Sequence, residues 1–146
     1  MRIVGIDPGE SGAIVSFDGN DVEVFYLKNI DPRHLWGHMA SLDPASCFLE
    51  SVHAGPSMGS SAAFGFGKGF GFLYMAAIAA GLDVSLVSPQ KWQKCIGLEE
   101  IGGGFGVNDK KKKKRNRDMA KTLFPKVLVT NANADALLIA HYGRMQ

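Results

Sequence analysis

Short runs of apolar residues separated by polar turns predict three β-strands within residues 1–28. The runs are rich in β-branched side chains, such as those of Ile3 and Val4, which suit a buried strand. Asp18-Gly19-Asn20 is a hairpin turn signal, so neighbouring strands are expected to pair antiparallel. The predicted strands cover residues 2–8, 12–18 and 21–28.

After residue 30 the pattern changes to helices that alternate with short strands. Apolar residues three and four apart predict helices, and Asp31-Pro32 and Ser88-Pro89 are typical of helix starts. The predicted helices cover residues 31–42, 60–80, 90–96, 110–123 and 131–142, and the predicted strands cover residues 45–49 and 82–87. Residues 126–129 are expected to form a brief extended segment, and the glycine-rich stretch 97–108 a mobile loop.

Residues 64–71 alternate phenylalanine or lysine with glycine, a pattern that is compatible with a strand as well as a helix. We favour a helix, because residues 74–80 continue with good helix formers and Gly81 supplies a stop. Its glycines would allow the backbone to approach the sheet or a partner chain closely.

These elements predict one α/β domain over residues 1–146. Strands after residue 44 are separated by helices and should run parallel to the first strand, which gives a mixed five-stranded sheet with helices on both faces. With 46% hydrophobic and 21% charged residues, the composition is that of a soluble globular protein.

The cysteines and the apolar runs predict a cytoplasmic protein. Cys47 and Cys95 lie in apolar surroundings without metal-binding spacing, so we expect both to be reduced and structural. The N-terminus enters a strand at once, so no signal peptide is expected. The longest apolar run, residues 72–80, is too short to span a bilayer, and no contact with a membrane is expected.

The net charge of +2 combines two unequal parts of the chain. Residues 1–90 carry four basic and nine acidic side chains, whereas residues 91–126 carry eleven basic and four acidic ones. The predicted helix 110–123 is positive on all sides, and phosphates would relieve its self-repulsion. A solvated surface helix and a nuclear-import-like tract are the alternatives. The expected DNA contacts are Lys91, Lys94, Lys110, Lys111, Lys112, Lys113, Lys114, Arg115 and Arg117.

Three carboxylates occupy positions at which α/β proteins build sites. Asp7 ends the first predicted strand, Glu50 ends the fourth, and Asp135 begins the last helix. If those strands are neighbours, the carboxylates meet at one sheet edge and repel each other unless a cation lies between them. Mg²⁺ or Mn²⁺ suits such oxygen ligands, and two ions about 4 Å apart can activate a water for phosphodiester hydrolysis. No pattern indicates a small-molecule cofactor.

Four blocks in this order resemble the RuvC-like Holliday-junction resolvases, in particular the small members found in bacteriophages. They are Gly5-Ile6-Asp7-Pro8-Gly9, Glu50 after an apolar strand, Ser88-Pro89-Gln90-Lys91-Trp92, and Ala134-Asp135-Ala136-Leu137-Leu138-Ile139-Ala140. The resemblance covers nearly the whole chain. It implies a ribonuclease H-like fold, a homodimer and metal-dependent nicking of four-way DNA junctions.

The resemblance also implies residue roles. Asp7, Glu50 and Asp135 match the positions that bind the catalytic metals. His53 matches a junction-facing position and is a candidate to stack on a base, and Lys68 is a candidate phosphate contact; for both, a structural role is an equal alternative.

The sequence departs from the family at one point. The last helix often carries a further acidic or histidine residue three or four positions before the aspartate that matches Asp135, where this chain has Ala132 and Asn131. Asn131 could bind metal weakly through its carbonyl oxygen, or three carboxylates suffice, or an aspartate has been replaced by asparagine. Two rival functions therefore remain: another ribonuclease H-like nuclease acting on hybrid or branched nucleic acid, and a junction-binding protein with weak or no catalysis.

Overall fold

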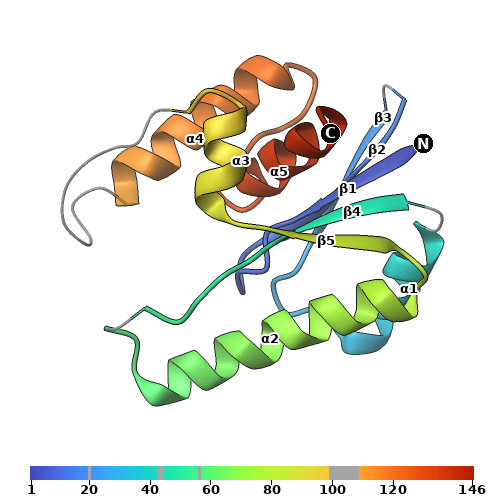
Figure 1. Ribbon diagram of the computed structural model, residues 1–146, viewed down its shortest axis with the longest axis vertical. Helices are drawn as coiled ribbons and strands as arrows, with labels where there is room; N and C mark the ends of the chain where they lie inside the picture. The colour runs from blue at the N-terminus through green and yellow to red at the C-terminus, as the bar shows by residue number, and fades with distance from the viewer. Residues whose placement is uncertain (20, 43–44, 56, 99–108) are drawn as a thin grey trace.

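A mixed five-stranded sheet runs between two layers of helices (Figure 1). In the computed structural model, residues 1–19, 21–42, 45–55, 57–98 and 109–146 are described. The strand order is β3-β2-β1-β4-β5. Strand β2 pairs antiparallel with both β1 and β3, whereas β4 pairs parallel with both β1 and β5. The strands are β1 Arg2–Ile6, β2 Ala13–Asp18, β3 Asp21–Tyr26, β4 Ala45–Glu50 and β5 Asp83–Val87. The predicted mixed sheet is confirmed.

The helices cover both faces of this sheet (Figure 1). One layer contains α1 Pro32–Ser41 and α2 Ser60–Ala79, and the other contains α3 Pro89–Cys95, α4 Asp109–Leu123 and α5 Ala134–Arg144. Two predicted starts are confirmed in atomic detail: the Asp31 carboxylate accepts the N–H of Arg33, and the Ser88 hydroxyl accepts the N–H of Lys91.

Helix α5 lies directly on the centre of the sheet. A side chain at Gly5 on β1 would collide with the α5 backbone at Ala136 and Ala140, and one at Gly143 would collide with Phe48 on β4. Nearly all of α5 is buried as a result. This close approach brings the first turn of α5 to the carboxyl ends of β1 and β4.

Helix α2 is only partly covered by the rest of the protein. Its helical conformation is confirmed over the phenylalanine–glycine octet, and Leu73 and Ala77 are its buried side chains. Around the glycines of the octet, no described atom lies within 4 Å of an added Cβ, so none of them serves a close approach within this chain. The prediction that they let the helix approach the sheet is therefore wrong.

The length of α2 also bears on the expected absence of a membrane contact. Its 20 residues have a mean hydropathy of 1.3 over the most apolar window, of which 11% is buried, so the whole helix is long and apolar enough to cross a bilayer. The 72–80 run alone underestimated this element, because the octet continues it. One helix that meets criteria of length and composition is weak support for a membrane span.

Three local predictions differ from the structure. Residues 126–129 are not extended throughout: the N–H of Val127 bonds the carbonyl of Phe124 and closes a turn directly after α4. Helix α5 begins at Ala134 rather than at residue 131, because the Asn133 side chain accepts the N–H of Thr130 and thereby fixes a preceding turn. Cys47 is buried as expected, but Cys95 is exposed. Most of the predicted glycine-rich loop, residues 99–108, lies outside the described residues.

Candidate active site

Asp7 lies just after β1, where the backbone is fixed on both sides. Its N–H bonds the carbonyl of Ala13 at 3.1 Å, and its Oδ1 accepts the N–H of Gly9 at 3.1 Å. A side chain at Gly12 would collide with the Asp7 carbonyl, so the turn closes tightly around this residue. Burial, and next the charge of Asp135, raise the pKa of Asp7 to about 6.

Glu50 is the last residue of β4, beside Asp7 because β4 pairs parallel with β1. Its Oε1 accepts the indole N–H of the fully buried Trp92 at 2.8 Å. Burial raises the pKa of Glu50 to about 8; the Trp92 hydrogen bond acts in the opposite direction, and the charges of Asp7 and Asp135 raise the pKa further.

Asp135 faces the same region from the first turn of α5. Its Oδ1 accepts a hydrogen bond from Nδ2 of Asn116 on α4 at 2.8 Å. Burial raises the pKa of Asp135, while the Asn116 bond and the positive charges of Arg115 and Lys113 lower it. One carboxylate directly after β1, one at the end of β4 and one on α5 thus lie within electrostatic range of each other.

The three carboxylates share one arrangement of hydrogen bonds. Each has one oxygen that accepts an N–H: Gly9 for Asp7, Trp92 for Glu50 and Asn116 for Asp135. Within the described part of the chain, the second oxygen of each has no protein hydrogen-bond donor. The three carboxylates repel each other, and each has one oxygen that could bind a cation. A bound cation would relieve this repulsion, so the arrangement is typical of a cation site.

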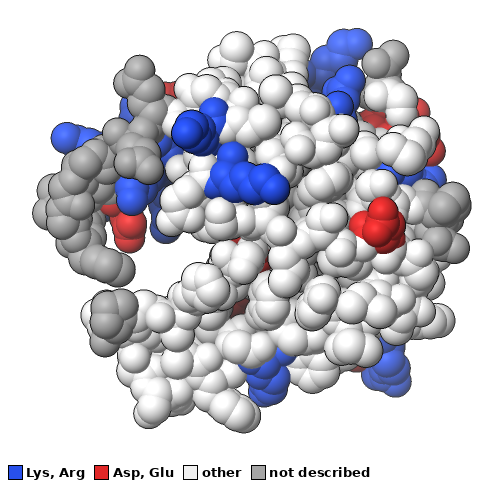
Figure 2. Space-filling view, viewed as in Figure 1, with Lys and Arg blue, Asp and Glu red and all other residues white. Residues whose placement is uncertain are grey.

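A small pocket of about 170 Å³ gives access to two of these groups. Asp7 and Asp135 line it together with Lys113 and Asn131, whereas Glu50 lies outside its lining and is 9% exposed. Among the described residues, no three acidic, histidine or cysteine side chains are close enough to hold one ion jointly as they stand. Figure 2 shows acidic atoms at the bottom of the hollow between the two helical layers.

Asn131 lines this pocket from the turn before α5, not from the helix on which it was predicted. Its Oδ1 accepts a hydrogen bond from Nη1 of Arg117 at 3.0 Å. A cation would therefore have to compete with Arg117 for the one oxygen that Asn131 could offer.

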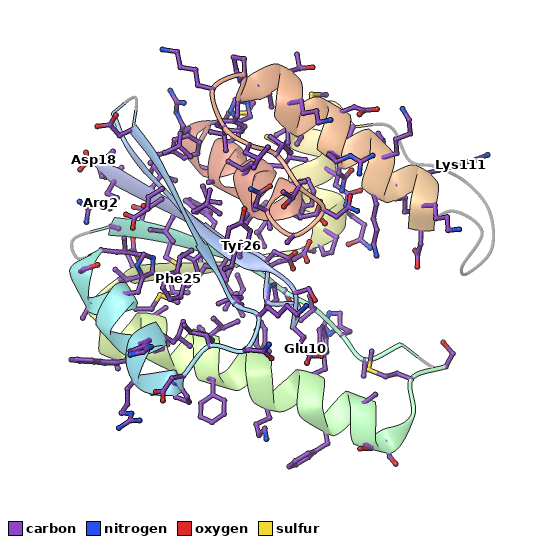
Figure 3. All side chains as sticks on the ribbon, turned by 180° about the vertical axis from the view of Figure 1, so that it is seen from behind. Arg2, Glu10, Asp18, Phe25, Tyr26 and Lys111 are labelled. Atoms are coloured by element: carbon purple, nitrogen blue, oxygen red, sulfur yellow. The ribbon has the colours of Figure 1, made fainter. Side chains whose placement is uncertain are left out.

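The basic residues of α4 fall into two groups. Lys110–Lys113 are exposed, and Figure 3 shows Lys111 directed away from the rest of the protein. Lys114, also exposed, forms an ion pair with Asp118 at 2.7 Å. Arg115 and Arg117 are half-buried and bond neighbouring side chains, those of Asn116 and Asn131 among them.

The remaining predicted contacts lie at the surface. Lys91 and Lys94 are exposed on α3, Lys68 is exposed on α2, and His53 is exposed in the segment that follows β4. Figure 3 shows Glu10 at one end of the sheet and the Arg2–Asp18 ion pair, of 3.2 Å, at the other end.

Two residues that touch the carboxylates were not predicted. Trp92 belongs to the Ser88–Trp92 block, but its bond to Glu50 joins positions 42 residues apart. Asn116 interrupts the basic run of α4 and is 4% exposed, and this uncharged residue among cations was the available signal.

Comparison with known proteins gives a fold but no family by sequence. No family model matches the chain, and no curated protein matches it. Thermus thermophilus RuvC is similar in structure, with a TM-score of 0.63 and 19% identity over 99% of this chain and 96% of that one. T. thermophilus RuvC in complex with a Holliday junction substrate is similar over the same shares, with a TM-score of 0.61 and 19% identity. The chain therefore shares the fold of T. thermophilus RuvC, and the RuvC-like fold expected from the sequence is confirmed.

Proposed function

We propose that this protein is a metal-dependent endonuclease that resolves four-way DNA junctions by paired nicks. The observation that carries the proposal is the convergence of Asp7, Glu50 and Asp135 from three elements at one end of the sheet. It is supported by the similarity to T. thermophilus RuvC, a structure of which contains a Holliday junction substrate.

The donor set fits Mg²⁺ or Mn²⁺. All three groups are carboxylates, and burial raises the pKa of each. The charge of Asp135 also raises the pKa of Asp7, and the charges of Asp7 and Asp135 raise that of Glu50. Each group has an oxygen without a described hydrogen-bond donor. Asp7, Glu50 and Asp135 would hold the cations, two in number, with Asn131 as a further ligand where Arg117 releases its amide oxygen. Bound cations would supply an activated water and charge stabilisation for the leaving oxygen of the phosphodiester.

The protein's own side chains prepare this site. The Gly9 N–H and the Ala13 carbonyl fix Asp7, so its free oxygen keeps one direction relative to the sheet. Lys113 lines the pocket beside the carboxylates, where its ammonium group can offset the charge of an incoming phosphate. Glu50 lies outside the lining of the pocket and is 9% exposed, so its carboxylate is largely away from water.

Helix α4 is the proposed DNA-binding surface, extended by Lys91 and Lys94 of α3. Exposed lysines contact phosphates without reading sequence, which suits an enzyme that selects a branched shape. Arg115 and Arg117 already bond protein side chains, so the main contribution is assigned to the exposed lysines. Lys68 and His53 stay candidate contacts from the opposite side of the hollow.

Paired nicks require two active sites, and α2 offers a surface for a homodimer. Its exposed side chains include Phe64, Phe72, Met75 and Ile78, which are 73%, 53%, 59% and 44% exposed. The octet glycines leave open space above the helix, which permits a second helix to approach closely. The lower layer in Figure 2 is correspondingly poor in charged atoms. A two-fold pair through this face would present two sites to one junction.

A synthetic four-way junction with differently labelled arms tests the proposal. With Mg²⁺ or Mn²⁺, we expect symmetric nicks near the branch point, and little cleavage of linear duplex or RNA–DNA hybrid of the same sequence. Asp7→Asn should abolish cleavage while junction binding is kept, because the substitution leaves the turn but removes a charge. Tight junction binding without product at any concentration of either ion would instead favour a non-catalytic binding protein, and preferential cleavage of the hybrid would favour the other ribonuclease H-like nuclease.

A further inference from the structure

Asn116 is a buried amide in the middle of a helix otherwise covered with cations. It is 4% exposed, and its Nδ2 donates to Asp135 Oδ1 at 2.8 Å. A buried polar side chain in such a position needs hydrogen-bond partners on both ends of its amide, and Asn116 has them.

Arg115 determines which way the Asn116 amide faces. Arg115 Nε and Nη2 donate to Asn116 Oδ1 at 3.1 and 2.8 Å. A guanidinium has only donors, so the oxygen of the amide must face Arg115 and its NH₂ group must face Asp135. Arg115 Nη2 also donates to Gln93 Oε1 on α3 at 3.1 Å, which ties the arginine to a second element.

Trp92 does the same for Glu50. The indole nitrogen is only a donor, and the ring is fully buried, so it cannot rotate away from Glu50 Oε1 at 2.8 Å. Both donors reach the site from α3 and α4, outside the elements that carry the carboxylates.

From this arrangement we propose that Asn116 and Trp92 are positioning residues for cation binding, which rests on the proposed function. Each holds one oxygen of a carboxylate with a donor that cannot become an acceptor, so the other oxygen is left for the ion. Partners of this kind typically change metal affinity by about 10–100-fold when they are removed.

The test measures Mn²⁺ binding to the DNA-free protein by titration calorimetry. Asn116→Leu keeps the approximate volume but removes the donor to Asp135, and Trp92→Phe keeps an aromatic ring but removes the donor to Glu50. Each is expected to weaken Mn²⁺ binding about tenfold or more. In cleavage assays the Mn²⁺ concentration for half-maximal rate should rise, with little change in the KM for the junction.

Thr122→Ala is the matched control. Thr122 also lies on α4 and its hydroxyl bonds the Asp118 carbonyl at 3.1 Å, but it has no contact with the site. It should bind Mn²⁺ like the wild type even if its unfolding midpoint falls. Urea unfolding of all variants separates lost affinity from lost folding, and if Asn116→Leu does not fold, Trp92→Phe decides the question.

The outcomes separate this proposal from the function on which it rests. Mn²⁺ affinity within about twofold of wild type in the folded variants overturns the positioning role but leaves the nuclease intact. A wild type that binds Mn²⁺ without cutting any junction overturns the resolvase assignment, while weakened binding in the variants still supports positioning. A wild type that binds no Mn²⁺ overturns both.

Discussion

Replacing Glu50 with glutamine should stabilise the metal-free protein at neutral pH, although the substitution removes a proposed metal ligand. The reason is that the folded protein raises the pKa of Glu50 from 4.5 to about 8, chiefly by burial. Between these values the folded state holds a proton that the unfolded state has lost. The free energy of unfolding is therefore highest below pH 4.5, where Glu50 is protonated in both states. It decreases as the pH rises to about 8, because folding then requires Glu50 to take up a proton.

The magnitude follows from the width of this pH interval. Each pH unit is equivalent to about 1.4 kcal/mol for one proton, so holding Glu50 protonated at pH 7 costs about 3 kcal/mol relative to an ordinary glutamate. Glutamine carries no charge, and its amide oxygen can still accept the Trp92 N–H. The gain from Glu50→Gln at pH 7 is therefore expected to approach about 3 kcal/mol.

Urea unfolding in EDTA at pH 5, 6, 7 and 8 measures this effect. The wild type should lose stability with rising pH by at most about 1.4 kcal/mol per unit from Glu50, and Glu50→Gln should show a flatter profile. Asp7, with a pKa of about 6, adds its share at the acidic end in both proteins. Added Mg²⁺ should restore the wild type at pH 8 and affect the variant much less. Parallel pH profiles for the two proteins in EDTA would refute the argument.

Two further predictions concern the surfaces. Changing Lys111 and Lys112 to alanine should weaken junction binding and reduce the slope of log affinity against log salt by about two, as fluorescence anisotropy at several salt concentrations would record; an unchanged slope would remove α4 from the interface. Phe72→Glu places a charge on the outer face of α2, where Phe72 is 53% exposed, and should convert a dimer into a folded monomer in light scattering. A dimer of unchanged affinity would place the contact between copies elsewhere.

The order and type of the elements could be predicted because local signals agree with the tertiary structure. Asp31 and Ser88 cap helices whose first residue is a proline, as the sequence predicts. The β-branched runs form the buried strands. The start of α5 could not be predicted in this way. It depends on the Asn133 side chain, which also donates to the Tyr26 hydroxyl, 107 residues earlier in the chain.

The same distinction separates the carboxylates of the site from the groups that hold them. Asp7, Glu50 and Asp135 stand at element ends, so topology alone brings them to one edge once β4 pairs with β1 and α5 crosses the sheet. Trp92 and Asn116 each act through one side-chain hydrogen bond, to residues 42 and 19 positions away in the sequence. The periodicity of the sequence does not predict such contacts.

The position of Arg117 bears on how many ligands this site can have. Arg117 bonds the amide oxygen of Asn131. Asn131 and Ala132 are the two positions at which the resemblance to the RuvC-like resolvases implies a further acidic or histidine residue. A guanidinium at that place adds positive charge where a fourth carboxylate would have added negative charge. If Asp7, Glu50 and Asp135 hold cations as proposed, they balance the charge of those cations without such a ligand, so the donors that orient them gain importance. We therefore expect the proposed cation affinity to depend on Asn116 and Trp92 more than it would in a site with four acidic ligands.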